Sequence, residues 1–228
     1  MSCLLGRWDG GFRKKLVLAW MPAVLIACLA GSPLAASAEG CFGTALVFAI
    51  DASGSIDDDQ YLLQMAGTGE ALRDPAIARA VREAGGVAMA AVVWSDTAVA
   101  SSVIGWHSVR SAADLDKFAH AIESLKRTGG GGTDIGDGLS RALDLLADPA
   151  LCALRRVVDV SGDGRETHYP RRRHGVSMAT ARKRAREEGV TVNGLAILDE
   201  EPDIEEYYRN RVAVGAGSFV SVANGFAD

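Results

Sequence analysis

The sequence has few of the residue types that would assign it to a class at once. Its 228 residues include four cysteines, four histidines and six prolines, and aromatic residues make up 6% of the chain. So few cysteines exclude a disulfide-rich scaffold, and the absence of an internal repeat or a low-complexity segment excludes solenoid and fibrous architectures. No Walker-type loop or dinucleotide-binding glycine signature follows a predicted strand. The remaining composition, 48% hydrophobic and 23% charged, is that of an ordinary globular domain.

Long hydrophobic runs are also absent, with one exception near the start of the chain. Basic residues 13–15 precede the apolar run 16–30, and the small residues Ala36-Ser37-Ala38 follow it. This order of charged, apolar and small residues is typical of a secretory signal. Because the run is short and contains Pro22, we expect no permanent transmembrane segment.

Cleavage after Ala38 is therefore the first prediction for this segment. Residues 1–38 would be the signal peptide, and residues 39–228 would form one exported domain, periplasmic or secreted. Leu25-Ile26-Ala27-Cys28 also resembles a lipoprotein processing site, so a lipoprotein anchored at Cys28 is the alternative.

An excess of basic charge is missing as well. Residues 1–38 carry four basic side chains and one acidic side chain, so cleavage changes the formal charge from −5 to −8. A moderately acidic domain has no general affinity for nucleic acid. Only Cys41 and Cys152 remain after cleavage, and two cysteines in an oxidising compartment suggest one disulfide bridge.

The first chemically informative stretch follows the predicted cleavage site. Residues 45–50 are six consecutive apolar residues, which predicts a strand buried on both faces, and Asp51, Ser53 and Ser55 follow it directly. Oxygen groups at the carboxyl end of a buried strand lie where open α/β sheets bind ligands, and they suit a hard cation such as Mg²⁺. By itself the pattern is also compatible with an ordinary turn or helix cap.

Two later segments add to this pattern. Thr133 follows a four-glycine loop, residues 129–132, and a second buried strand, 157–160, runs into Ser161-Gly162-Asp163. In this order the three segments resemble the metal-ion-dependent adhesion site of von Willebrand factor A-like (VWA) domains. Matched residue by residue, the resemblance implies five metal ligands: Asp51, Ser53, Ser55, Thr133 and Asp163.

The predicted elements agree with such a fold. Helical patterns begin near residues 57, 76, 111, 134, 176 and 203, and they alternate with strands predicted over 45–50, 87–94, 97–104, 155–161, 190–197 and 218–222. The alternation predicts an α/β fold with a doubly wound, mostly parallel sheet and helices on both faces. We interpret residues 97–104 as the antiparallel edge strand, joined to its neighbour by a hairpin at Ser95-Asp96.

The resemblance covers residues 41–224 and implies that the first strand lies beside the fourth. It extends to a group of exported bacterial VWA-like proteins without an assigned function, through the stretches 93–95, 157–164 and 194–197. Domains of this kind usually close with a helix after the last strand. Because the sequence ends at Asp228, we expect that helix to be missing here.

The ligand set implied by the resemblance predicts a binding function. Hydroxyls of Ser53, Ser55 and Thr133 would bind the ion directly, whereas Asp51 and Asp163 would act largely through water. An ion with few charged ligands stays electrophilic and can recruit an Asp or Glu of a protein partner, as such sites do in the family. We therefore expect a non-enzymatic protein-binding module that uses a divalent cation, with Mg²⁺ first and Mn²⁺ and Ca²⁺ as alternatives.

The same geometry predicts how the two cysteines pair. Cys41 precedes Asp51 by ten residues and Cys152 precedes Asp163 by eleven. If the two aspartates meet at one end of adjacent parallel strands, the cysteines lie at the same level at the other end. We therefore predict a Cys41–Cys152 disulfide.

Two other functions stay open at this point. A Mg²⁺-dependent phosphoryl-transfer or hydrolytic enzyme would usually place a second carboxylate two residues after the first, where this chain has Ser53. Among the histidines only His168 falls on the predicted metal-side loop, which also contains the arginine cluster 171–173. The third interpretation is a structural domain whose ion only stabilises the fold.

Overall fold

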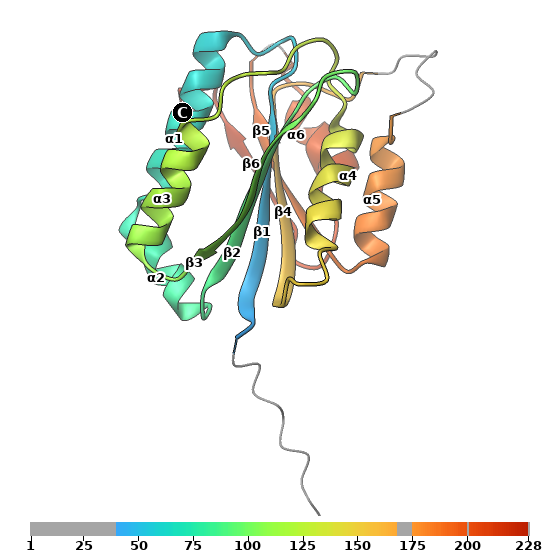
Figure 1. Cartoon of the computed structure of the whole chain (residues 1–228). Helices are drawn as coiled ribbons and strands as arrows, with labels where there is room; N and C mark the ends of the chain where they lie inside the picture. Colours follow the sequence, from blue (N-terminus) through green and yellow to red (C-terminus); the bar gives the residue numbers. More distant parts are fainter. Residues whose placement is uncertain (1–39, 168–174, 200, 228) are drawn as a thin grey trace, which may run out of the picture. The chain divides into compact units, whose positions relative to one another are not determined.

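A six-stranded sheet crosses the molecule in the order β3-β2-β1-β4-β5-β6, as the computed structural model shows (Figure 1). All neighbouring strands are parallel except β2 and β3. The structure describes residues 40–167, 175–199 and 201–227, so the predicted signal peptide, its cleavage site and Cys28 lie outside the described residues. The strands are β1 Phe42–Asp51, β2 Val87–Trp94, β3 Ser102–Val109, β4 Ala153–Gly162, β5 Thr191–Ile197 and β6 Val220–Ala223.

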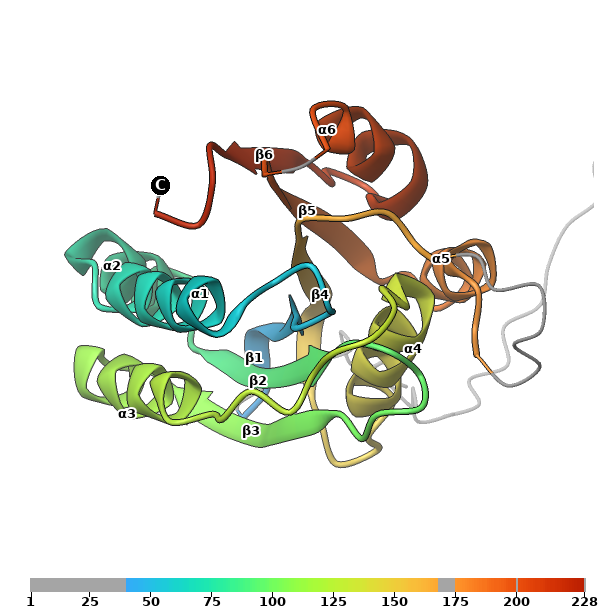
Figure 2. The same cartoon turned by 90° about the horizontal axis from the view of Figure 1, so that it is seen from above.

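Helices cover both faces of this sheet. Figure 2 shows α1, α2 and α3 on one side and α4 and α5 on the other, which confirms the predicted doubly wound α/β fold with one antiparallel edge strand. The helices are α1 Asp58–Leu72, α2 Pro75–Glu83, α3 Ala112–Glu123, α4 Ile135–Leu146, α5 Met178–Glu187, and α6 Ile204–Tyr207, which continues into the π-helix η1 Tyr208–Val212. Within the described part of the chain, none of them has the length and apolar character needed to cross a bilayer.

The continuous apolar run of β1 is explained by two cores. Ala45, Val47 and Ala49 belong to the core beneath α4, α5 and η1. Ile50 belongs to the core beneath α1 and α3, and Phe48 packs against that core. Because β1 is a central strand, side chains of both orientations are removed from water, so the strand needs no polar alternation.

Helix α1 begins as its acidic residues predict, but its buried face differs from the expected one. Asp57 is the N-cap: its side chain accepts the Gln60 N–H, and the Gln60 side chain accepts the Asp57 N–H. The apolar side chain of Leu62 is 59% exposed, whereas the polar Gln64 is buried. The Gln64 amide is buried because it holds polar groups at the end of the sheet, as described below.

The antiparallel edge strand exists, but the prediction of its limits was wrong. It runs over Ser102–Val109 instead of 97–104, and no hairpin forms at Ser95-Asp96. The backbone N–H and the hydroxyl of Thr97 both donate to the Asp134 carboxylate, each over 2.5 Å. Because Thr97 is bonded to Asp134, next to the glycine loop, the residues after β2 do not pair with it at once, and β3 begins only at Ser102.

The end of the described chain also differs from the prediction. The single helix expected near residues 203–211 is one α-helical turn, α6, continued by η1. The last strand, expected over 218–222, is β6 at Val220–Ala223. A π-helical turn shifts the side chains by one position relative to an α-helix, which periodicity alone does not predict.

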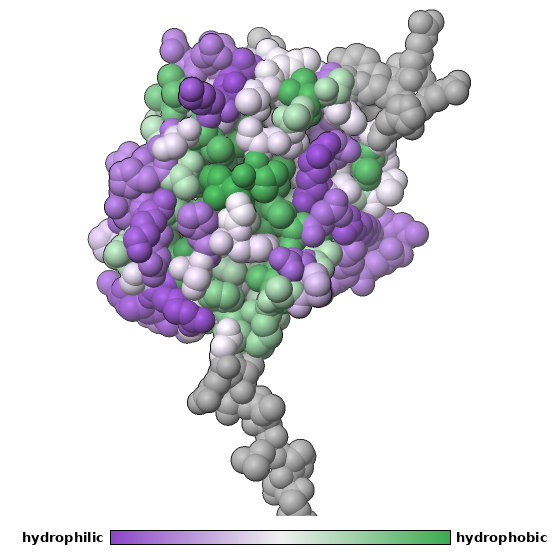
Figure 3. Space-filling model, viewed as in Figure 1, coloured by the Kyte–Doolittle hydropathy of each residue, from purple (hydrophilic) through white to green (hydrophobic). Residues whose placement is uncertain are grey.

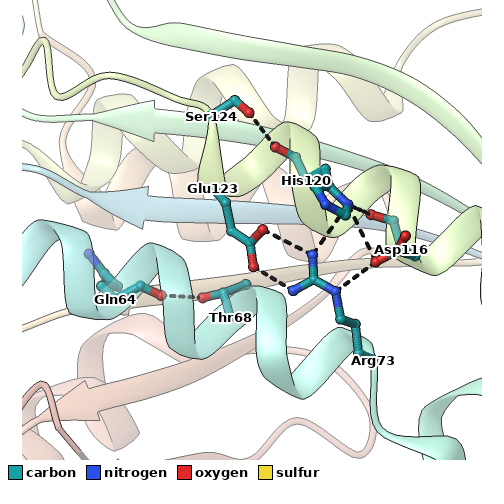
Figure 4. A network of polar contacts seen from close by, with 7 residues as sticks. All are labelled: Gln64, Thr68, Arg73, Asp116, His120, Glu123 and Ser124. Atoms are coloured by element: carbon teal, nitrogen blue, oxygen red, sulfur yellow. Dashed lines mark hydrogen bonds and ion pairs between the residues drawn. The ribbon is translucent and has the colours of Figure 1, made fainter.

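A polar network joins α1 to α3 on the outer surface. The Arg73 guanidinium, just beyond α1, donates to Asp116 over 2.7 Å and to both carboxylate oxygens of Glu123 over 2.5 and 2.9 Å (Figure 4). Arg73 lowers the pKa of both carboxyl groups through these hydrogen bonds. His120 lies in the same network, where its ring Nδ1 is 2.8 Å from the Asp116 carbonyl oxygen.

The predicted disulfide is confirmed. Cys41 and Cys152 are bonded, with their Cα atoms 4.7 Å apart, and Phe42 N–H donates to the Cys152 carbonyl over 2.9 Å. The bond lies where β1 and β4 begin, at the opposite end of these strands from Asp51 and Asp163.

Candidate functional site

The candidate site lies at the carboxyl end of the two central strands. Asp51 is the last residue of β1, and Asp163 directly follows β4. The two strands are parallel neighbours, with Ile50 opposite Ser161. From β1 the chain continues to β2 on one side, whereas β4 lies on the other, so this is the switch point where open α/β sheets bind ligands.

Four of the five predicted residues form a chain of contacts. The Ser53 N–H donates to Asp51 Oδ1 over 2.7 Å, and the hydroxyls of Ser53 and Ser55 lie 3.3 Å apart. The Ser55 hydroxyl in turn donates to Asp163 Oδ1 over 2.9 Å. Residues 108 positions apart in the sequence are thus joined directly at the sheet edge.

The glycine loop brings Thr133 to the same place. Gly54 N–H donates to the Gly131 carbonyl over 3.0 Å, and a Cβ on Gly54 would lie 2.8 Å from that oxygen. Gly131 has a φ of +72°, which only glycine adopts readily. Thr133 Oγ1 lies 3.6 Å from the position a Cβ on Gly164 would take, so this hydroxyl faces the segment that carries Asp163.

The backbone around Thr133 is fixed by two further segments. Thr133 N–H donates to the Thr167 hydroxyl over 3.0 Å, and Thr167 N–H donates to the Thr133 carbonyl over 2.8 Å. Gly132 N–H donates to the Asp96 carboxylate over 3.1 Å. The loop is therefore held from both sides and leaves the Thr133 hydroxyl in a defined position.

The site is buried at its base and opens at one residue. Asp51 and Ser53 are fully buried, and Asp163 and Thr133 are 3% and 8% exposed. Ser55 is exposed to solvent. The cluster can therefore be reached from outside at Ser55, while its carboxylates are shielded.

Without a bound cation, a negative charge on Asp51 is unfavourable. Burial, and then the nearby charge of Asp163, raise the pKa of Asp51 from 3.8 to about 8, against the opposing hydrogen bonds from Ser53 and Ala52. The second oxygen, Asp51 Oδ2, is buried and has no hydrogen-bond partner. An unsatisfied buried carboxylate oxygen carries a full desolvation cost, which a neighbouring cation would offset.

The side chains of the cluster suit a divalent cation that prefers oxygen ligands. Three hydroxyls and two carboxylates offer oxygen only, which suits Mg²⁺, Mn²⁺ or Ca²⁺. In the part of the chain that the structure describes, no three Asp, Glu, His or Cys side chains gather closely enough to hold a metal. A carboxylate-rich or zinc-type site is thus not seen there, and the hydroxyl-rich cluster is the candidate.

Three residues that the sequence did not single out support the site. Gln64 of α1 donates to the Asp51 carbonyl over 3.0 Å and accepts the Ser161 hydroxyl over 3.0 Å, so it joins β1 to β4. Arg127 donates to the Ser53 carbonyl over 3.1 Å. A polar residue on the apolar face of a predicted helix is the signal that could have identified Gln64.

Tyr208 is the third of these residues, and no sequence signal connects it to the site. A Cβ on Gly162 would lie 2.5 Å from the Tyr208 hydroxyl and 2.7 Å from Asp51 Oδ2, so both atoms adjoin this glycine. Burial, together with the charges of Asp51 and Asp163, raises the pKa of Tyr208, which keeps the phenol neutral. Its hydroxyl is buried without a partner, as is Asp51 Oδ2.

Neither histidine in the described residues joins the cluster. His107 lies on β3 with its ring centre 5.2 Å from that of Phe118, and His120 belongs to the surface network of α3. His168, His174 and the arginine cluster 171–173 lie outside the described residues.

Comparison with solved structures shows a VWA-like fold. The pilus adhesin SpaC of Lactobacillus rhamnosus GG matches with a TM-score of 0.59 at 14% identity, over 82% of this chain and 29% of SpaC. Proximal thread matrix protein 1 of the mussel byssus matches with a TM-score of 0.56 at 21% identity, over 80% of this chain and 42% of the byssus protein. One structure of that protein has a zinc-occupied MIDAS motif. The vWF domain of the pili tip protein Mfa5 of Porphyromonas gingivalis matches with a TM-score of 0.54 at 11% identity, over 80% of this chain and 90% of that domain.

This chain spans less than half the length of SpaC and of the byssus protein. Among curated proteins no sequence matches it. One family model matches residues 41–228, which is nearly all of the described chain. The chain therefore belongs to the family described as "Protein of unknown function (DUF1194)".

Proposed function

We propose that this protein is an exported, metal-dependent protein-binding module. The observation that carries the proposal is the arrangement of the site: buried Asp51 has an unsatisfied oxygen, and its other oxygen is bonded to the Ser53 backbone in a cluster of hydroxyls that opens to solvent at Ser55. A divalent cation held by the hydroxyls would satisfy that oxygen through a bound water and offset its negative charge. A partner Asp or Glu arriving at the open side would complete the shell of the ion.

The five predicted residues divide into two roles. The hydroxyls of Ser53, Ser55 and Thr133 would hold the ion directly, since they are neutral and converge from two loops. Asp51 and Asp163 would orient the hydroxyls and bound water, as the hydrogen bond from Ser55 to Asp163 already does. Such a cation supplies an electrophilic centre for a carboxylate, with Mg²⁺ as the first choice and Mn²⁺ or Ca²⁺ as alternatives.

Export and a protein partner are supported by independent observations. A disulfide joins Cys41 to Cys152, and disulfides persist in oxidising compartments. Structures with a similar fold include a pilus adhesin and a byssus matrix protein. A periplasmic or secreted location after cleavage near Ala38 agrees with both, and N-terminal sequencing of the protein from its own cell distinguishes this from a lipid-modified Cys28.

The test separates partner binding from folding with conservative variants. Asp51→Asn keeps an acceptor for the Ser53 N–H, and Thr133→Val keeps the shape while the backbone bonds to Thr167 remain. Ser108→Ala removes an exposed hydroxyl from β3, at the other end of the sheet, and is the control. Each protein is used to capture partners from the cell envelope, with Mg²⁺ or with chelator, and its melting temperature is measured at pH 7.

We expect the wild type and Ser108→Ala to capture the same partners with Mg²⁺ and none with chelator. Asp51→Asn and Thr133→Val should lose capture in both conditions while staying folded. In chelator the melting temperature of Thr133→Val should be close to that of the wild type, and that of Asp51→Asn should be higher, because it lacks the buried charge. Capture by chelated wild type would show that the ion is structural or absent. Turnover of a phosphate ester that depends on Mg²⁺ and on Asp51 would favour an enzyme instead.

A further inference from the structure

A pocket lies at the opposite end of the sheet from the candidate metal site. It has a volume of about 400 Å³ and is formed by α5, η1 and the segment that leads into β6. Gly215 in its wall lies against Thr191, the first residue of β5, which places the pocket at the amino end of the parallel strands. Its lining includes Arg182, Arg186, Arg209, Ser218, Phe219 and Val220, and none of the described residues that line it is acidic.

The positive charge of this pocket is largely uncompensated. Other basic residues of α5 have acidic partners: Lys183 pairs with Glu187, and Arg184 pairs with Asp144 and Glu188. The surface over α4 and α5 in Figure 3 is largely hydrophilic. Among the described residues, by contrast, no carboxylate forms an ion pair with Arg182 or Arg186. Of the three arginines in the lining, only Arg209 has an acidic partner, Glu205.

The surroundings of Arg182 disfavour its positive charge. Burial lowers the pKa of Arg182, and the charges of Arg186 and Arg211 lower it further. Arg182 and Arg186 thus lie near each other without a carboxylate partner among the described residues, in a domain whose overall formal charge is negative. An anion in the pocket would remove this repulsion.

The pocket is also preorganised. Arg182 donates through Nε and Nη2 to the Ala213 carbonyl, over 3.1 and 2.9 Å, so its guanidinium is fixed before any ligand arrives. Arg186 lies four positions later on the same face of α5, one turn away. Guanidinium groups bind phosphate and carboxylate oxygens in pairs, and a fixed group loses little entropy in doing so.

We infer that this pocket, formed by Arg182, Arg186 and Arg209, binds a phosphate group of an anionic ligand. A phosphate dianion matches the charge of the two unpaired guanidiniums better than a single carboxylate does. Phe219 is 55% exposed beside the arginines, so an apolar part next to the phosphate would have a surface to cover. The phosphate could belong to a soluble phosphorylated molecule or to a lipid headgroup, and the experiment distinguishes the two.

The test uses the full chain as its own cell processes it. Inorganic phosphate is titrated at constant ionic strength, with acetate as the comparison anion, and the amide signals of Gly215 and Ser218 are followed by NMR. In a second arm the protein is sedimented with vesicles of anionic phosphatidylglycerol or of zwitterionic phosphatidylcholine. Arg186→Gln is the pocket variant because this arginine is exposed, and Arg79→Gln, on exposed α2, is the matched control.

We expect phosphate to shift the Gly215 and Ser218 signals more strongly than acetate does. Arg186→Gln should weaken the phosphate affinity about tenfold, whereas Arg79→Gln should leave it unchanged. Anionic vesicles that sediment the wild type but not Arg186→Gln would assign the phosphate to a lipid, and phosphate binding without vesicle binding would assign it to a soluble ligand. Equal shifts with acetate, or no effect of Arg186→Gln in both arms, would overturn the inference.

Discussion

At the scale of single residues, Asp51 combines a structural cost with a proposed function. Its carboxyl group is fully buried, one of its oxygens has no partner, and Asp163 is close enough to oppose its ionisation. A protein that never bound a cation here would be more stable with an amide or an apolar residue at this position. Retaining a carboxylate therefore agrees with a site whose resting state is completed by an ion.

The first prediction concerns the stability of the metal-free protein against pH. The pKa of Asp51 is raised to about 8 in the folded state, so folding favours the protonated form. This contribution is fully present below about pH 4 and is lost as the pH rises through about 8, with an upper bound of about 6 kcal/mol. In chelator, Asp51→Asn should therefore be more stable than the wild type at pH 9, with a much smaller difference at pH 5, as measured by urea unfolding.

Asp59→Asn is the matched control, because it removes an exposed carboxylate from the first turn of α1. Its difference from the wild type should be nearly the same at both pH values. Adding Mg²⁺ at pH 9 should stabilise the wild type and leave Asp51→Asn unchanged. Parallel pH profiles for the wild type and Asp51→Asn in chelator would contradict the prediction.

At the scale of elements, glycines allow α4 to approach the sheet closely. A Cβ on Gly138 would lie 2.4 Å from the Trp94 ring, and a Cβ on Gly136 would lie 2.3 Å from the backbone of Met178. Trp94 is opposite Asp51 in the sheet, and Thr133 directly precedes the N-cap of α4. The close packing of α4 therefore positions the loop that carries the Thr133 hydroxyl.

The second prediction uses two glycines in helices. Gly138→Ala should destabilise the protein by about 1–3 kcal/mol, because the new methyl group meets a buried ring. Gly67→Ala in α1, where a Cβ meets nothing within 4 Å, should stabilise it by about 0.5–1 kcal/mol. Thermal unfolding of both variants at the same pH makes the comparison. A stabilising Gly138→Ala would show that α4 can move away from β2 without cost.

At the scale of the whole molecule, the two central strands are held at both ends. The Cys41–Cys152 bond joins the amino ends of β1 and β4, and the contact from Ser55 to Asp163 joins their carboxyl ends. The bond closes a loop of 111 residues that contains α1 to α4. The candidate site is therefore built on a pair of strands that is linked at both ends.

The third prediction follows from this loop. Replacing both cysteines by serine should lower the free energy of unfolding by about 2–5 kcal/mol, since the unfolded chain gains the conformational freedom that the bond removes. Reduction of the wild type should give the same loss, and the double variant should not respond to reductant. The melting temperature with and without reductant measures both. An unchanged melting temperature in the double variant would mean that the bond contributes nothing.

The sequence by itself determined the fold class and the disulfide, and through its resemblance to VWA domains it indicated the five oxygen-bearing residues. Each of these depends on a local pattern: an apolar run that ends in Asp51, a glycine loop before Thr133, and two cysteines at matching distances from two strand ends. Parallel strands hold such patterns in register, so the positions of Asp51 and Asp163 along their strands predict where Cys41 and Cys152 meet.

Only the tertiary structure decided which other side chains reach these residues. Gln64, Arg127 and Tyr208 come from three separate segments and adjoin the site through the packing of helices on the sheet. The limits of β3 depended likewise on contacts from Thr97 to Asp134, 37 positions away. Local periodicity reports which face of an element is apolar. It does not report which polar groups from distant segments will meet, because that depends on how the elements pack together.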